Sequence, residues 1–187
     1  VARGSIGWRL MRVIAGTYRG RILKAPPGAG TRPTSDRVRE ALFSILGPRV
    51  AGARVLDLFA GSGALGLEAL SRGAREVTFV DHAASAIRAI KANLEALGAT
   101  AEVHRIDAVR FVRAASGNAA QYDLVFLDPP YGQGERFARS LSEALPAVLA
   151  SGAVAVTESD RRAPLALDLP LQDERRYGDT LIRIHGT

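Results

Sequence analysis

The segment Asp128-Pro129-Pro130-Tyr131, which follows the apolar run 122–127, carries the strongest chemical signal in the sequence. Two successive prolines lack amide donors and fix the backbone, so carbonyl oxygens can be held toward a ligand. The Asp128 carboxylate and the Pro129 carbonyl could accept both hydrogens of an exocyclic amine, while Tyr131 stacks on its ring. The alternative interpretation is a rigid turn after a strand, capped by aspartate.

A glycine-rich turn near residue 60 is a second candidate site. Residues 55–66 have the pattern of a strand that turns on Gly61, Gly63 and Gly66 into a helix, which lets the backbone approach a ligand closely. Asp81 follows Gly61 by 20 residues, at the end of the next apolar run. An acidic side chain there can accept hydrogen bonds from two ribose hydroxyls.

Asp57 distinguishes between the cofactor classes that use such a turn. A carboxylate at this strand end can engage a cationic amino-acid group but would repel a pyrophosphate, which favours S-adenosylmethionine over a nicotinamide dinucleotide. Asp107 follows the third apolar run. Its carboxylate could accept a hydrogen bond from an adenine amino group or cap the following helix, and both interpretations stay open.

The two candidate sites together predict methyl transfer to an amine. The nitrogen would be oriented toward a methyl group on sulfur for in-line displacement, and positioning and electrostatics would supply most of the catalysis. A nicotinamide oxidoreductase shares the glycine turn. However, the sequence offers no evident acid or base for hydride transfer, and that function leaves Asp128 and the two prolines unexplained.

The elements that must position these residues alternate between strands and helices. Helical periodicity at 83–97 and 136–149 separates the apolar runs, which predicts an α/β fold with a parallel sheet covered by helices. Two further strands at 167–176 and 180–185 flank Tyr177-Gly178-Asp179, and the last strand is expected to be antiparallel. The five apolar runs are 54–59, 77–81, 102–106, 123–127 and 153–158.

Basic charge is concentrated in the first quarter of the chain. Residues 1–49 contain nine arginines and one lysine against two carboxylates, a net charge of +8, whereas the whole chain carries +6. Such a block favours a polyanion partner, although a solvated arm is the alternative. Residues 11–24 predict a basic β-hairpin, and a helix is expected to run to residue 47. The candidate N-caps of that helix are Thr34, Ser35 and Asp36.

Composition and length bear on metal sites, membrane segments and the number of domains. The chain has no cysteine, and its three histidines form no cluster with ligand spacing, so we expect no metal. No run of apolar residues approaches the length of a transmembrane helix, and residues 1–10 lack signal-peptide features, so we expect a cytoplasmic protein without membrane contact. The length of 187 residues suits one catalytic domain.

The chain resembles the RsmD family, the bacterial 16S ribosomal RNA guanine-N2 methyltransferases. Segments 12–24, 31–43 and 177–180 carry this resemblance, together with the glycine turn and the Asp-Pro-Pro-Tyr segment about 70 residues beyond it. The resemblance implies a Rossmann-like class I methyltransferase fold, with a mostly parallel seven-stranded sheet, an antiparallel last strand and an N-terminal hairpin. It implies S-adenosylmethionine as cofactor and, as target, the N2 amine of a guanine in a 16S rRNA loop near the P site.

The same resemblance implies action on the assembled or assembling small subunit and assigns roles to individual positions. We expect the protein to be a monomer. The target base would be held by Asp128, Pro129, Pro130 and Tyr131. The cofactor would be held by Asp57, Ala60, Gly61, Ser62, Gly63, Gly66, Asp81, His82, Asp107, Ala108, Thr34 and Arg39. RNA would be held by Arg12, Arg19, Arg21, Lys24, Arg32 and Arg37.

Three segments are expected: an unassigned leader (1–10), an RNA-binding hairpin and helix (11–47) and a methyltransferase domain (48–187). A guanine in a loop is only partly stacked, so extruding it should cost a few kcal/mol at most. Two alternatives remain, because the Asp-Pro-Pro-Tyr segment can hold any exocyclic amine and the basic hairpin needs no catalysis. They are an adenine amino-methyltransferase acting on DNA or RNA, and a non-catalytic RNA-binding assembly factor.

Overall fold

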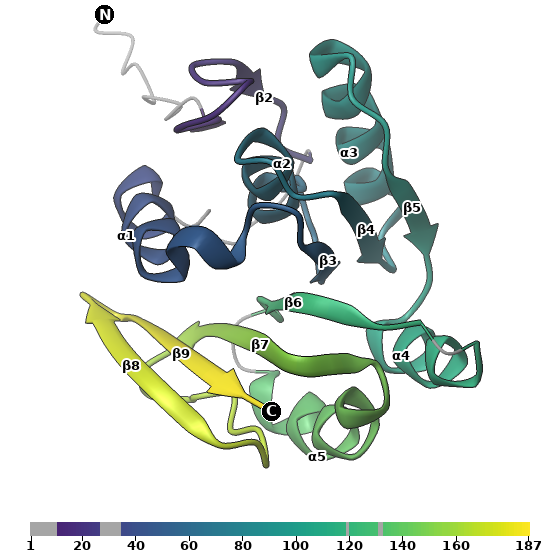
Figure 1. Ribbon diagram of the computed structural model, residues 1–187, viewed down its shortest axis with the longest axis vertical. Helices are drawn as coiled ribbons and strands as arrows, with labels where there is room; N and C mark the ends of the chain where they lie inside the picture. The colour runs from purple at the N-terminus through teal and green to yellow at the C-terminus, as the bar shows by residue number, and fades with distance from the viewer. Residues whose placement is uncertain (1–10, 27–34, 119, 131–132) are drawn as a thin grey trace, which may run out of the picture.

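The computed structural model describes residues 11–26, 35–118, 120–130 and 133–187. A seven-stranded sheet runs through the molecule, with helices on both of its faces (Figure 1). Its strands are β3 (Arg54–Leu58), β4 (Glu76–Asp81), β5 (Glu102–Arg105), β6 (Tyr122–Leu127), β7 (Leu149–Asp160), β8 (Leu171–Tyr177) and β9 (Thr180–Gly186). The helices are α1 (Asp36–Leu46), α2 (Ala64–Ser71), α3 (Ala84–Leu97), α4 (Ala108–Gly117) and α5 (Gly134–Ala144), with short 3-10 turns η1 (Gly47–Arg49) and η2 (Leu145–Ala147).

The strand order is β5-β4-β3-β6-β7-β9-β8. The five strands from β5 to β7 are parallel, and β9 is antiparallel to both β7 and β8. The mostly parallel sheet with an antiparallel last strand is therefore confirmed. The chain runs outward through β4 and β5 and then returns to pair β6 with β3, so the direction of winding reverses between β3 and β6. Ligands of such sheets bind beyond the carboxyl ends of the strands at this reversal.

Two apolar clusters hold the layers together. Helices α1, α2 and α3 cover one face of the sheet, and α4 and α5 cover the other (Figure 1). Alternate residues of one strand feed both clusters: Val55 packs with the first layer, while Leu56 and Leu58 pack with the second. Strands that are buried on both faces are mostly apolar, which explains why the apolar runs predicted them.

The N-terminal hairpin is shorter in its paired part than the sequence indicates. β1 (Met11–Arg12) pairs with β2 (Ile22–Leu23) in antiparallel register, so each strand has two residues and the rest of 11–24 is turn and loop. The hairpin still joins the main core, because Met11, Val13 and Leu23 are buried in the same cluster as α1 and α2.

Helix α2 anchors the hairpin through one buried carboxylate and one close backbone approach. The Glu68 carboxylate accepts hydrogen bonds from the amides of Ile14 (2.8 Å) and Ala15 (3.1 Å). Gly16 has a φ of +82°, and a Cβ atom there would lie 1.8 Å from the carbonyl oxygen of Ser71. Only glycine fits this position, since both the backbone conformation and the space exclude a side chain.

Three elements have other boundaries than predicted, and prolines account for two of them. The helix predicted to reach residue 149 ends at Ala144, because Pro146 has no amide to continue the hydrogen-bond ladder. β8 begins at Leu171, directly after Pro170, rather than at residue 167. β7 spans Leu149–Asp160, well beyond the predicted 153–158, because it pairs with β6 on one side and β9 on the other.

Among the described residues, no helix is both long and apolar enough to span a bilayer.

Candidate active site

The glycine turn lies between β3 and α2, at the carboxyl edge of the sheet. Gly61 and Gly63 have φ values of +57° and +79°, a region that favours glycine. Among the described residues, Phe59 is the only one other than glycine that has a positive φ (+61°). Such a conformation costs on the order of 1–3 kcal/mol and persists only where the surroundings enforce it, which is common at ligand sites.

Gly66 serves a different purpose, in the first turn of α2. A Cβ atom at this position would lie 2.3 Å from Cε1 of Phe79 on β4, whose ring is fully buried. The absence of a side chain therefore lets α2 pack directly on the sheet. This is the role that the third glycine of a dinucleotide-type turn plays in close helix–strand packing.

Asp57 lies beneath this turn as a buried carboxylate. Its Oδ2 accepts a hydrogen bond from the Gly66 amide (2.9 Å), so it ties β3 to α2. Burial raises the pKa of the Asp57 carboxyl to about 8; the Asp81 charge adds to this increase, and the Gly66 hydrogen bond opposes it. The predicted contact with a cationic ligand group stays a prediction.

Asp81 connects the end of β4 to the glycine turn. Its Oδ2 accepts the Gly61 amide (2.9 Å) and its Oδ1 accepts the Ala83 amide (2.8 Å). One side chain thereby fixes the distance between the turn and the start of α3. The ring of His82 is exposed, and its Nδ1 lies 3.7 Å from the Asp81 carboxylate. The ribose contact predicted for Asp81 stays a prediction.

The other predicted cofactor positions occupy the same edge in different ways. Asp107 caps α4 by accepting the Arg110 amide (3.0 Å), so the capping interpretation is confirmed, while the adenine contact stays a prediction. Ala60 and Ala108 are buried. The hydroxyl of Ser62 lies 3.3 Å from the Met11 sulfur and thus faces the hairpin.

Asp128, Pro129 and Pro130 directly follow β6, the strand paired with β3. The pKa of the Asp128 carboxyl is raised well above its usual range, first by burial and then by the negative charges of Glu158 and Asp57. Asp57 lies in β3 and Glu158 in β7, and Asp128 directly follows β6, the strand between them. They bring several carboxyl oxygens together near one part of the sheet edge, which suits a ligand that presents hydrogen-bond donors. Tyr131 lies outside the described residues.

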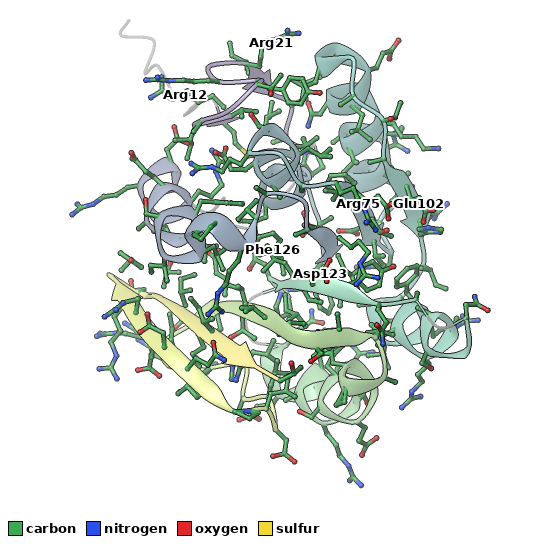
Figure 2. All side chains as sticks on the ribbon, in the orientation of Figure 1. Arg12, Arg21, Arg75, Glu102, Asp123 and Phe126 are labelled. Carbon is green, nitrogen blue, oxygen red and sulfur yellow. The ribbon has the colours of Figure 1, made fainter. Side chains whose placement is uncertain are left out.

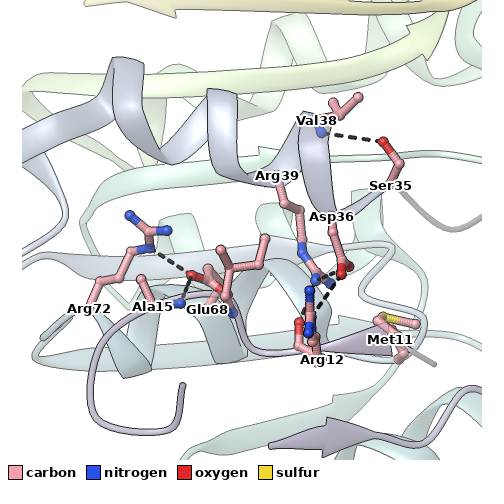
Figure 3. Close-up of polar contacts among 11 residues, drawn as sticks. Met11, Arg12, Ala15, Ser35, Asp36, Val38, Arg39, Glu68 and Arg72 are labelled. Carbon is pink, nitrogen blue, oxygen red and sulfur yellow. Dashed lines mark hydrogen bonds and ion pairs between the residues drawn. The ribbon is translucent and has the colours of Figure 1, made fainter. Parts of the chain in front are cut away.

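Arg39 occupies an unexpected place for a predicted cofactor contact. Its guanidinium is fully buried between α1, the hairpin and α2, and its Nη2 donates to the Arg12 carbonyl and to Asp36 at 2.9 Å (Figure 3). Burial lowers the pKa of Arg39, while Asp36, Glu68 and Glu158 counteract this shift. Its Nε and Nη1 have no hydrogen-bond partner among the described residues.

The cap of α1 is Ser35, whose hydroxyl accepts the Val38 amide (3.3 Å; Figure 3). Of the three candidate caps, the structure therefore selects the middle one. Thr34 and Arg32, predicted to contact cofactor and RNA respectively, lie outside the described residues.

The basic side chains of the hairpin are exposed. Arg12 and Arg21 project from it (Figure 2), and Arg19 and Lys24 are exposed as well. Arg12 pairs with Asp36 at 3.3 Å, and Arg21 donates to the Ala96 carbonyl. Arg12 and Arg21 each contact another part of the protein but stay exposed, so a polyanion can still reach them.

Sequence reasoning missed three polar residues that organise the site: Glu158, Glu68 and Asn93. Glu158 could have been found, because it is an acidic residue near the end of a predicted strand, as are Asp57 and Asp81. Asn93 is a buried residue of α3 whose amide nitrogen donates to the carbonyls of Ser62 and Lys24, both at 3.0 Å. Neither it nor Glu68 carries a sequence signal, since each acts on segments far away in the chain.

A comparison with known families now identifies the chain. The family described as Conserved hypothetical protein 95 matches residues 11–186. This chain belongs to that family. A Bacillus subtilis relative with the provisional name rRNA methyltransferase YlbH is 42% identical over 180 residues, spanning 94% of this chain and 98% of the relative. Ribosomal RNA small subunit methyltransferase D of Haemophilus influenzae is 44% identical over 124 residues, spanning 65% and 64% of the two chains. The resemblance to the RsmD family is confirmed.

Solved structures agree with this family and with the fold. The 16S rRNA N2-guanine methyltransferase RsmC of Thermus thermophilus, in complex with S-adenosylmethionine and guanosine, superposes with a TM-score of 0.71 and 25% identity. The match covers 87% of this chain and 45% of that one. The Rossmann-like methyltransferase fold is thus shared.

Proposed function

We propose that this member of the family transfers a methyl group from S-adenosylmethionine to the N2 amine of a guanine in 16S rRNA. The observation that carries the proposal is the pairing of β3 with β6, which places the glycine turn and Asp128 on neighbouring strand ends. A methyl donor bound at the turn and an amine bound at Asp128 can meet there. The Haemophilus influenzae relative is named as a small-subunit rRNA methyltransferase, and the RsmC complex combines this cofactor with guanosine.

The residues around the glycine turn fit the proposed cofactor. Gly61 leaves open backbone at the turn, since a Cβ atom there would have only the Phe59 carbonyl oxygen within 4 Å. The buried Arg39 has two donor nitrogens without a partner among the described residues, and these suit a carboxylate such as that of a methionine group. Asp57 and Asp81 would face its cationic amine and its ribose, respectively. Bound S-adenosylmethionine supplies a methyl carbon carried by a positively charged sulfur.

The target amine would be held by acceptors at the end of β6. Asp128 and the carbonyl of Pro129 accept its two hydrogens, and Tyr131 stacks on the base. A donor amine stabilises the charged form of Asp128, so the bound base would offset the crowding by Glu158 and Asp57 that raises the pKa. No strong base is needed, because the nitrogen loses a proton readily once it carries the methyl group.

Recognition of the RNA would begin at the hairpin. Arg12, Arg19, Arg21 and Lys24 are exposed there, and they gain free energy by displacing counterions from phosphates. A guanine in a loop near the P site would then be extruded into the site at modest cost, since loop bases are only partly stacked.

The test is methyl transfer to unmodified small ribosomal subunits from labelled S-adenosylmethionine, followed by nucleoside mass spectrometry. We expect N2-methylguanosine at one loop position. Methylated adenine would replace the guanine assignment with the adenine alternative. Cofactor binding without transfer to subunits, free RNA or DNA would support an assembly factor, and binding of NADH would support an oxidoreductase.

Two asparagine variants make this test specific to the site. Asp128→Asn should lower the rate of transfer at least a hundredfold, because an amide presents one donor group where the amine needs an acceptor. Asp123→Asn is the matched control: Asp123 lies at the start of the same strand, where it pairs with Arg54 at 2.9 Å. Equal activity of the two variants would contradict the proposed role of Asp128.

A further inference from the structure

A pocket outside the proposed catalytic site lies between the first turn of α1 and the turn that joins β8 to β9. Its volume is about 340 Å³, and it is lined by Ser35, Arg37, Val38, Arg176, Tyr177 and Gly178. In Figure 1 this turn lies beside α1. A volume of a few hundred Å³ is enough for a small ligand or one nucleotide unit.

The lining combines a free cation with an aromatic ring. Arg37 is exposed and forms no hydrogen bond or ion pair with any described residue. Tyr177 is partly buried and packs against the core cluster that contains Val38. An arginine beside a supported aromatic ring is the combination by which proteins hold single-stranded nucleic acid, through phosphate contact and base stacking.

The register of the sheet relates this pocket to Asp128. β6 and β7 are paired up to Leu127 and Thr157, so Asp128 lies beside Glu158. Glu158 is paired with Ile182, and Ile182 with Arg175, two residues before Tyr177. Directly paired residues share a face of the sheet, as do residues two apart on one strand.

This path crosses three strand spacings and two residues of rise, so Tyr177 lies roughly 15 Å from Asp128, on the same face and toward the same edge. The pocket lies beyond β7, whereas Asp81 at the end of β4 and Asp107 after β5 lie on the other side of Asp128. The proposed cofactor thus extends one way from Asp128 and the pocket lies the other way. One base cannot reach both, but the strand that carries it can.

We infer that this pocket binds one nucleotide of the rRNA strand that flanks the methylated base, with its base against Tyr177 and its phosphate at Arg37. The inference rests on the proposed function, because it takes the strand at Asp128 to be RNA. It assigns binding, not chemistry, to Arg37 and Tyr177.

The experiment measures the affinity of the protein for unmodified small subunits, together with KM and kcat for methyl transfer. Arg37→Gln and Tyr177→Ala should each weaken subunit binding and raise KM roughly tenfold, the size of one stacking or phosphate contact. The kcat and the affinity for S-adenosylmethionine should not change. Tyr177→Phe keeps the ring and should behave like the unaltered protein.

Arg139→Gln provides the control, since Arg139 is 90% exposed on α5, which covers the other face of the sheet. If Arg37→Gln and Arg139→Gln give the same affinity and KM, the pocket does not bind RNA. Arg37→Gln changes an exposed side chain and should not affect folding. The comparison therefore stays valid even if Tyr177→Ala is unstable. Subunit binding is measured without catalysis, so the two proposals can fail separately. If the unaltered protein transfers no methyl group, the proposed function is refuted. If Arg37→Gln still weakens subunit binding in that case, the pocket is retained as an RNA-binding site.

Discussion

Two glycines of the hairpin offer a matched test of how it is held on α2. Gly16 and Gly20 have nearly identical φ values, +82° and +81°, but their surroundings differ. A Cβ atom at Gly16 would lie 1.8 Å from the Ser71 carbonyl oxygen, whereas one at Gly20 would have nothing within 4 Å. Substitution by alanine therefore imposes the same backbone strain at both positions and a steric clash at only one.

The expected losses follow from the contacts. The left-handed conformation costs alanine about 1–2 kcal/mol at either position. At Gly16 the backbone clash must also separate the turn from α2, which breaks the hydrogen bonds of Thr17 N to Ser71 O (2.8 Å) and of Tyr18 N to Ser71 Oγ (2.9 Å). The bond from Ser71 Oγ to the Ala15 carbonyl is lost as well. At about 1 kcal/mol each, these bonds add roughly 3 kcal/mol.

Urea titration would measure the free energy of unfolding of both variants. Hydrogen exchange at the Thr17 amide would detect local release of the hairpin from α2. We expect Gly16→Ala to lose about 3 kcal/mol more than Gly20→Ala, in global stability or in local protection. We also expect it to bind small subunits more weakly, because the exposed arginines are no longer held in place. Equal losses for the two variants would refute the reasoning, since they would mean that the close approach to Ser71 contributes nothing.

Other contacts give further expectations. Gly66→Ala should destabilise the fold by about 2 kcal/mol, because the cost of overpacking against Phe79 exceeds the gain in helix propensity; an increase in melting temperature would contradict this. Asp57 has a folded-state pKa of about 8 against an ordinary value of 3.8, so the folded state binds its proton more tightly and loses stability as pH rises between these values. Asp57→Asn should therefore show a smaller loss over that range in pH-dependent unfolding, and identical profiles would exclude the effect. Because protonation removes an acceptor from Asp128, kcat/KM should fall on acidification, and a flat profile of rate against pH would argue against its proposed role.

The strands and the acidic residues near their ends could be predicted from the sequence because both follow from local chemistry. A strand buried on two faces is apolar until it reaches the edge, where Asp81 and Asp128 mark the change. Parallel pairing then brings such residues to one side of the sheet, whatever the rest of the chain does. The order of the strands and the reversal between β3 and β6 were not predicted and come from the structure.

What could not be predicted depends on contacts between distant segments. Arg39 reads as an exposed helix residue, yet α1 buries it against the hairpin 27 residues earlier in the chain. Glu68 looks like an ordinary helix carboxylate and instead receives two amides from a loop 53 and 54 residues away. The pocket at Tyr177 exists only because α1 and the β8–β9 turn meet.

The two open edges of the sheet bear on how the protein behaves at high concentration. Among the described residues, no strand pairs with the outer side of β5 or of β8, so each offers a template onto which a strand of another molecule could add. Both carry charges of opposite sign at close spacing: Glu102 and Arg105 on β5, and Asp173, Glu174, Arg175 and Arg176 on β8. An added strand would bring its own side chains against these charges and disturb ion pairs such as Arg175 with Asp173 (3.1 Å). The sheet thus has edges that resist fibrous self-association, although the core between its faces is apolar.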